Sequence, residues 1–258
     1  MTKPMSQGAV TLSHDQAEAF DQISAMLKEA GVDLDDSLLM PPKPSASSVA
    51  AVMGKAGSGK TLLLAQLFES LRDAGVSIIS GDYESKKALD RRTLAILAPT
   101  NKAASVLRMR GVPATTIHRI LYSPVYDPEY EKIADCLAEN GSRPEIEGLT
   151  DEALDRAHAF YQLHKSIPGA LAAAGLRGSD FITGWKRRDE PLDIGFVDEG
   201  SMLDDRQFDD LKEIFSTLLV FGDPAQLAPV NQSGSMVFDK LPEKDRFSLS
   251  RIHRQDAD

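Results

Sequence analysis

Eight residues in the first quarter of the chain have the types and spacing of a phosphate-binding loop. They read GKAGSGKT, from Gly54 to Thr61, between the apolar run 49–53 and the apolar segment 62–68. A strand, a glycine-rich loop and a helix in this order are typical of a P-loop. The glycines allow successive N–H groups to turn toward phosphate oxygens at the positive end of the helix. A plain glycine-rich turn is the alternative, but the complete G-x-x-x-x-G-K-T pattern favours nucleotide binding.

The side chains of this loop have separate chemical roles in that prediction. The Lys60 amino group can reach the β- and γ-phosphates, and the Thr61 hydroxyl can ligate Mg²⁺. The metal bridges the same phosphates and neutralises charge as the γ-phosphoryl group leaves. The nucleotide-binding residues expected from the loop are Gly54, Ala56, Gly57, Ser58, Gly59, Lys60, Thr61 and Leu62.

Two adjacent carboxylates can complete a phosphoryl-transfer site. Asp198 and Glu199 follow the apolar run 192–197, which reads as a buried parallel strand. Asp198 can hold Mg²⁺ through water, while Glu199 orients and deprotonates the attacking water. An acidic pair that simply begins a helix is the alternative. Together with the P-loop, the pair favours an ATPase whose cofactors are ATP and Mg²⁺.

The elements that must position these residues form an α/β fold with a mainly parallel sheet and helices on both faces. The expected strands are the apolar runs 49–53, 93–98, 192–197 and 218–221. Ligands of open α/β sheets bind at the carboxyl ends of the strands. We therefore expect Asp198, Glu199 and Asp223 to lie near the P-loop.

Composition divides the chain into three predicted parts. Residues 1–48 hold an N-terminal helix, for which Ser13 is a candidate N-cap, and a linker rich in proline and serine. Residues 49–121 and 191–258 form the ATPase domain. Residues 122–190 interrupt the strand pattern and are predicted to be a small inserted subdomain.

Charge and cysteine content exclude some classes of protein. The 258 residues include 29 Lys and Arg against 39 Asp and Glu, a net charge of −10, so any DNA site must be local. The single cysteine, Cys136, excludes an intramolecular disulfide framework. The sequence has neither an apolar signal segment nor a run long enough to span a membrane. We expect a soluble protein of the cytoplasm that has no membrane partner.

Seven segments, in order along the chain, resemble the motifs of the RecD-like and Dda-like branch of superfamily 1 (B branch) DNA helicases, which includes proteins like the exodeoxyribonuclease V alpha subunit. LSHDQAEAF (12–20) resembles the Q motif, GKAGSGKT (54–61) motif I and APTNKAASVL (98–107) motif Ia. TTIHRIL (115–121) resembles a short family motif that follows motif Ia. VDEGSML (197–203) resembles motif II, GDPAQLAPV (222–230) motif III and LSRIHRQ (249–255) motif IV. The resemblance covers the whole chain. One departure is Gly200, where the family usually has a small, alanine-like residue.

The resemblance implies a RecA-like P-loop NTPase fold and three further site residues. Gln16 would read the edge of adenine, because its amide both donates and accepts hydrogen bonds. Gln226 would contact the γ-phosphate or the attacking water, and Arg254 would be an arginine finger. A surface arginine near a chain end is the alternative for Arg254. The expected catalytic residues are Lys60, Asp198, Glu199, Gln226 and Arg254.

The resemblance also implies a site for single-stranded DNA. Thr100, Asn101 and Lys102 follow a strand and open a helix, so they suit backbone phosphates. Thr116 and His118 are similar candidates, although a lone histidine is more often structural. Contacts of this kind do not read base sequence, and they weaken with salt.

A strand-separating pin is predicted in the insertion. Phe181 and Trp185 flank Thr183 and Gly184, a possible hairpin tip, and an exposed ring there could stack on the last base pair. Packing of both rings in the core of the insertion is the alternative.

The resemblance implies an ATP-dependent DNA helicase or translocase that moves 5′ to 3′ along single-stranded DNA. Family members have a second RecA-like domain, so we expect this chain to be a fragment with weak activity of its own. The alternatives are an ATP-gated regulatory module of a nuclease complex and an RNA-directed superfamily 1 motor. A nuclease or recombination partner, DNA repair and a bacterial or phage-infected cell are also expected by resemblance.

Overall fold

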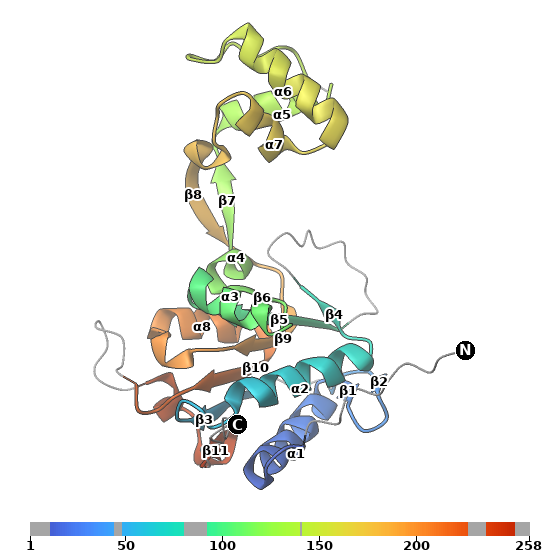
Figure 1. The fold of residues 1–258 in the computed structure, drawn as a ribbon, viewed down its shortest axis with the longest axis vertical. Coiled ribbons are helices and arrows are strands. Elements are labelled where there is room, and N and C mark those ends of the chain that lie inside the picture. The colour runs from blue at the N-terminus through green and yellow to red at the C-terminus, as the bar shows by residue number, and fades with distance from the viewer. Residues whose placement is uncertain (1–10, 44–47, 80–91, 140, 227–235, 251–258) are drawn as a thin grey trace, which may run out of the picture. The chain divides into compact units, whose positions relative to one another are not determined.

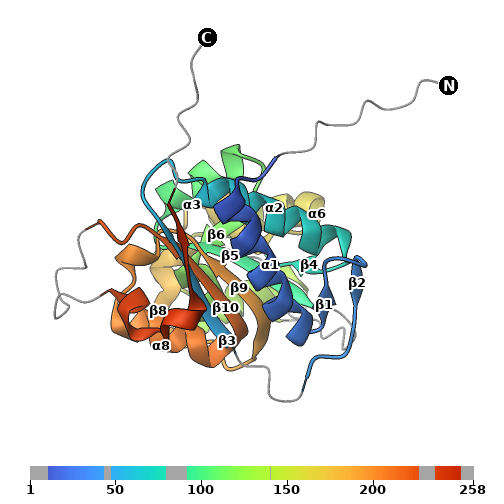
Figure 2. The same ribbon diagram turned by 90° about the horizontal axis from the view of Figure 1, so that it is seen from below.

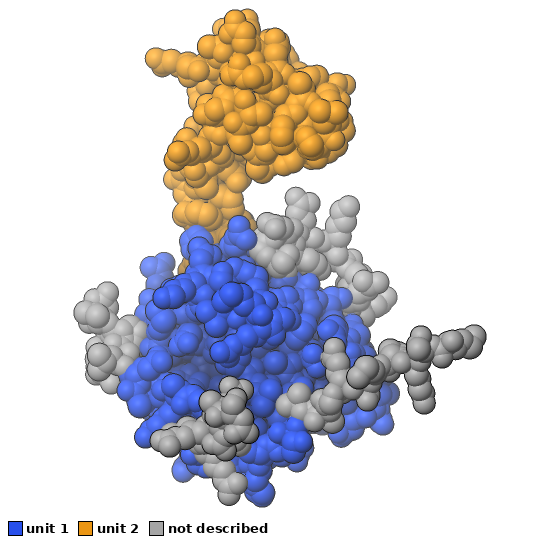
Figure 3. All heavy atoms as spheres, in the orientation of Figure 1, with its two compact units in different colours: residues 1–121, 188–258 blue, residues 122–187 orange. Residues whose placement is uncertain are grey.

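The computed structural model describes residues 11–43, 48–79, 92–139, 141–226 and 236–250. The chain divides into two compact units (Figure 3). Residues 122–187 form the smaller unit, and residues 1–121 and 188–258 form the larger one. The predicted insertion extends to residue 190, three residues beyond the end of the smaller unit.

The larger unit is built on a parallel sheet, seven strands of which lie in the described residues (Figure 1). Their bounds are β3 (Ser48–Gly54), β4 (Ser77–Ile78), β5 (Thr93–Ala98), β6 (Ala114–Thr116), β9 (Leu192–Val197), β10 (Phe215–Gly222) and β11 (Arg246–Leu249). The order is β11-β3-β10-β9-β5-β4, and β6 also pairs with β5. Every pairing is parallel, as the continuous apolar runs predict.

Helices cover both faces of this sheet (Figure 2). Their bounds are α1 (His14–Glu29), α2 (Lys60–Asp73), α3 (Asn101–Met109), α4 (Ile117–Leu121) and α8 (Asp205–Ile214). The first three pack on one face, where Ile23, Leu67 and Leu107 join Phe196 and Phe221 in one apolar cluster. Helix α8 lies on the opposite face. The predicted α/β P-loop fold, with a mainly parallel sheet between helices, is therefore confirmed.

Helix α1 begins as its sequence predicts. Ser13 is the N-cap, and its hydroxyl accepts the N–H of Gln16 while the Gln16 side chain accepts the N–H of Ser13. The segment expected to be only a linker contains a short antiparallel pair, β1 (Val32–Asp33) and β2 (Leu38–Leu39). The buried Asp33 carboxylate accepts two backbone N–H groups and so fixes the turn between these strands.

The smaller unit has its own core. Its elements are β7 (Tyr122–Tyr126), α5 (Pro128–Leu137), α6 (Asp151–His164), α7 (Ile167–Ala173), a short 3₁₀ helix (Gly178–Phe181) and β8 (Ile182–Arg187). Strands β7 and β8 pair antiparallel, and Gly184 lies opposite Val125. Thr183 and Gly184 are thus inside a strand, so the prediction that they form a hairpin tip is wrong. The chain between β7 and β8 forms the three helices and not a tight hairpin turn.

Candidate nucleotide-binding site

The glycine-rich loop between β3 and α2 has the backbone geometry that requires glycine. Gly57 and Gly59 have φ of +80° and +88°, in the left-handed region. A Cβ on Gly59 would lie 2.0 Å from Nε2 of Gln16, and one on Gly54 would lie 2.2 Å from Oγ of Ser58. Gly59 is the N-cap of α2 and provides no side-chain cap, so the first N–H groups of the helix can bind an anion.

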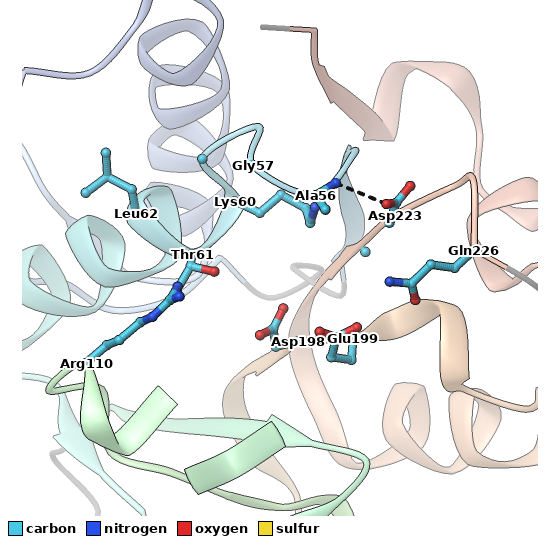
Figure 4. A pocket seen from close by; sticks show the side chains of 12 residues that line it. Ala56, Gly57, Lys60, Thr61, Leu62, Arg110, Asp198, Glu199, Asp223 and Gln226 are labelled. Atoms are coloured by element: carbon cyan, nitrogen blue, oxygen red, sulfur yellow. Dashed lines mark hydrogen bonds between the residues drawn. The ribbon is translucent and has the colours of Figure 1, made fainter. Parts of the chain in front are cut away.

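The loop is held by its own lysine and by an aspartate that is distant in the sequence. The Lys60 amino group donates hydrogen bonds to the carbonyls of Gly54 and Lys55, the latter at 3.0 Å. The N–H of Ala56 donates to Oδ2 of Asp223 at 3.1 Å (Figure 4). Burial lowers the pKa of Lys60, while the negative charge of Asp223 and of the two other nearby carboxylates opposes this shift.

The acidic pair follows β9 directly. Burial raises the pKa of Asp198, and the positive charges of Lys60 and Arg110 oppose that shift. Burial also raises the pKa of Glu199, and the charge of Asp198 adds to the effect. The Glu199 backbone has a left-handed φ of 55°, which is uncommon for a residue with a side chain.

Gln226 lines the same pocket as the acidic pair and is held by a buried hydroxyl. The Ser201 hydroxyl, only 1% exposed, donates to Oε1 of Gln226 at 2.6 Å. The nearby Gln226 side chain lowers the pKa of the Glu199 carboxyl, against the effect of burial. The N–H of Gln226 donates to the carbonyl of Asp223 at 3.2 Å. Gln226 is thus held at its side-chain oxygen and at its backbone N–H.

These groups line one pocket of about 480 Å³ (Figure 4), a volume in the range of small-molecule sites. Its lining residues are Ala56, Gly57, Gly59, Lys60, Thr61, Leu62, Arg110, Asp198, Glu199, Gly222, Asp223 and Gln226. The free helix N-terminus and Lys60 suit a phosphate chain, and the oxygens of Thr61 and Asp198 suit Mg²⁺. The residues present therefore fit a magnesium–nucleotide complex.

Arg110 lines the pocket but is not among the residues predicted from the sequence. It is the C-cap of α3 and lies just after the segment that resembles motif Ia. No local sequence pattern marks Arg110 as a pocket residue, because the direction of its side chain depends on where α3 ends. Gly222 and Asp223, by contrast, are where an apolar strand followed by an acidic residue predicts them.

Three of the predicted nucleotide-binding residues do not line the pocket. Gly54 ends β3, and Ser58 is buried, with a hydroxyl that has no hydrogen-bond partner among the described residues. Gln16 is 1% exposed, and its Nε2 donates to the carbonyl of Gly59 at 3.1 Å. Gln16 therefore supports the P-loop from α1. Arg254, the predicted arginine finger, lies outside the described residues.

The candidate DNA-binding residues lie outside this pocket. Thr100 is the N-cap of α3 and accepts the N–H of Ala103 at 3.1 Å. Asn101 and Lys102, in the first turn of α3, are exposed. Thr116 ends β6, and His118 is exposed on α4.

The two rings predicted to form a pin have different surroundings. Phe181 is 9% exposed and belongs to the core of the smaller unit, where its ring centroid lies 6.0 Å from that of Tyr130. Trp185 is 51% exposed on β8. Of these two rings, that of Trp185 is the one exposed enough to stack on a base.

Comparison with protein families decides which family the chain belongs to. The family described as AAA domain matches residues 44–258, which is most of the chain. The chain belongs to this AAA domain family. Comparison with curated proteins finds no match.

Among solved structures, the chain is similar to Pif1 helicase from Candida albicans at 17% identity and a TM-score of 0.43, over 97% of this chain and 42% of that one. It is also similar to Bacteroides sp Pif1 in complex with ADP-AlF4, at 16% identity and a TM-score of 0.41, over 96% and 44%. A third similar structure, of DNA unwinding at forked dsDNA by two coordinating Pif1 helicases, has 16% identity and a TM-score of 0.40, over 96% and 46%. The chain spans less than half the length of each of these solved chains. No helix in the described residues is long and apolar enough to cross a membrane.

Proposed function

We propose that this chain binds and hydrolyses ATP as the motor domain of a DNA helicase or translocase. The observation that carries the ATPase part is the convergence of Lys60, Thr61, Asp198, Glu199 and Gln226 on one pocket at the carboxyl edge of a parallel sheet. These residues come from segments far apart in the sequence. Their types are those that phosphoryl transfer requires.

In the proposed reaction, each residue has a position-dependent task. Lys60 leaves the carbonyls of Gly54 and Lys55 and binds the β- and γ-phosphates, while Thr61 and Asp198 hold Mg²⁺. When bound, the metal neutralises the charge that develops on the phosphates. Glu199 accepts a proton from the attacking water, and its raised pKa makes the carboxylate a better base. Gln226 lines the same pocket as Glu199 and contacts the γ-phosphate or the attacking water.

The helicase part of the proposal rests on the seven ordered segments. We place single-stranded DNA at Thr100, Asn101, Lys102, Thr116 and His118, and propose movement in the 5′ to 3′ direction. A second RecA-like domain, an arginine finger at position 254 and a nuclease or recombination partner belong to the same proposal. Trp185 remains the candidate pin residue. To bind adenine, the Gln16 amide would have to break its hydrogen bond to the Gly59 carbonyl and bond to the base instead.

The decisive experiment measures ATP binding and steady-state ATP hydrolysis at low salt, with and without single-stranded DNA. Lys60→Ala is the test variant. Lys244→Ala removes the same charge from an exposed position outside the pocket and is the control. We expect Lys60→Ala to lose hydrolysis and Lys244→Ala to retain it. Equal activity of the two variants would contradict the nucleotide site.

The DNA arm of the experiment tests the motor separately. We expect single-stranded DNA to stimulate ATP hydrolysis by the wild-type chain, and rising salt to weaken the effect. Stimulation only by RNA of matched sequence would favour the RNA-directed motor. ATP turnover that neither nucleic acid changes would contradict a nucleic-acid motor while leaving the ATPase site intact.

A further inference from the structure

One cationic side chain in the pocket has no task in the proposed reaction. Arg110 extends from the end of α3 into the pocket, toward the part that Thr61 and Asp198 line (Figure 4). Among the described residues, no hydrogen bond or ion pair holds its guanidinium. Arg108, two residues earlier, is different because it donates to the carbonyl of Ala114 and the hydroxyl of Ser105, both at 2.8 Å. Arg108 is thus a structural residue, whereas Arg110 is available to a ligand.

The charges around Arg110 indicate what kind of ligand it serves. Asp198, Glu199 and Asp223 line the pocket together with a single amine, that of Lys60, which donates to loop carbonyls. A triphosphate that entered this pocket without a metal would be repelled by the three carboxylates. The positive charge of Arg110 already acts on Asp198, the carboxylate proposed to hold Mg²⁺.

We propose that Arg110 binds the phosphates of ATP on the metal side of the pocket and thereby allows ATP to bind without Mg²⁺. This inference rests on the proposed nucleotide site. A guanidinium keeps its charge at every relevant pH and can donate two parallel hydrogen bonds to a phosphate. When Mg²⁺ is bound, the metal neutralises the same phosphates, so the contribution of Arg110 is smaller. The effect of removing Arg110 must therefore depend on the metal.

The test measures the Kd of ATP by isothermal titration in buffer with Mg²⁺ and in buffer with EDTA. Arg110→Gln is compared with Arg206→Gln, which removes the same charge from an exposed position of α8 outside the pocket. In EDTA we expect Arg110→Gln to weaken ATP binding about tenfold or more, the size typical of a lost charge-assisted hydrogen bond. In Mg²⁺ we expect a loss of less than about threefold. Arg206→Gln should match the wild type in both buffers.

A conservative variant separates charge from shape. Arg110→Lys keeps the charge, so in EDTA it should lose less affinity than Arg110→Gln. Equal losses for these two variants would contradict a role based on charge. Circular dichroism of each variant checks that the chain is folded.

The outcomes also separate this inference from the proposed function. A wild-type chain that binds ATP in neither buffer would overturn the proposed function and the role of Arg110 together. If the wild type binds in both buffers and Arg110→Gln equals Arg206→Gln, only the role of Arg110 is overturned. Wild-type binding that requires Mg²⁺ also overturns it, since the proposal states that Arg110 makes the metal dispensable for binding.

Discussion

The contact between Gly59 and Gln16 predicts that Gly59→Ala destabilises the chain by more than its backbone geometry alone requires. Gly59 has a left-handed φ of +88°, and an added Cβ would lie 2.0 Å from Nε2 and 3.1 Å from Cδ of Gln16. The Gln16 side chain cannot simply rotate into solvent, because the residue is only 1% exposed. The substitution must therefore displace a buried amide.

The expected loss in the free energy of unfolding of Gly59→Ala has two parts. A left-handed alanine costs about 1–2 kcal/mol relative to glycine. Displacing the amide breaks the hydrogen bond from Nε2 to the Gly59 carbonyl, and an unsatisfied buried polar group costs about 1–3 kcal/mol. The sum is about 2–5 kcal/mol, a large share of the total stability of a typical domain, which is about 5–15 kcal/mol.

Urea unfolding followed by circular dichroism measures this effect. The control is Gly111→Ala, because Gly111 has a φ of +81° and no atom within 4 Å of an added Cβ. We expect the control to lose only the backbone part, about 1–2 kcal/mol. In a Gln16→Ala background, Gly59→Ala should cost about as much as the control, since the clash is gone. The reasoning is refuted if Gly59→Ala and Gly111→Ala cost the same in the wild-type background.

Three further predictions follow from single contacts. Gly200→Ala should lower the free energy of unfolding by about 1–3 kcal/mol, because an added Cβ would lie 2.2 Å from a methyl group of β10, whereas Gly184→Ala, with no atom within 4 Å, should not. The hydrogen bond and charge of Lys28 hold the pKa of Asp33 below its ordinary value. The stability advantage of the wild type over Asp33→Asn should therefore be complete above about pH 3.8 and disappear as the pH falls through the lower, folded-state pKa. Lys102→Ala should reduce the salt slope of single-stranded DNA binding by about one.

Each of these predictions can fail in a specific way. Thermal unfolding that does not distinguish Gly200→Ala from Gly184→Ala would show that the site near β10 can relax. Acid unfolding in which Asp33→Asn keeps a constant deficit at every pH below 3.8 would exclude linkage through the Asp33 carboxyl. A binding titration in which Lys102→Ala and Lys244→Ala have the same salt slope would remove Lys102 from the DNA site.

The elements that the sequence predicts well are those with strong local signals. Around Gly54–Thr61, an apolar run marks the strand and a glycine pattern marks the loop before the helix. Strands β5 and β9 have the predicted bounds 93–98 and 192–197. The Ser13 cap is a local motif of four residues. Such features depend on neighbours in the sequence, so they can be read without the fold.

The features that were missed depend on contacts over long sequence distances. Strands β6 and β11 have three and four residues and exist because they add to an existing sheet. The direction of the Arg110 side chain depends on where α3 ends. Thr183 and Gly184 lie in β8 and not in a hairpin turn, because β8 pairs with β7, from which three helices separate it in the sequence. The pocket support from Gln16 required α1 to pack beside the P-loop. None of these distances is visible in a local pattern.

The order of the central strands explains how residues far apart in the sequence come together in the candidate site. Strand β10 lies between β3 and β9, with Gly222 opposite Met53 and Val220 opposite Val197. This register brings Asp223 to the N–H of Ala56, and the turn after β10 brings Gln226 into the pocket that Glu199 also lines. A ligand that moves the turn at 223–226 should therefore also move the phosphate-binding loop, because the Asp223 carboxylate accepts the N–H of Ala56.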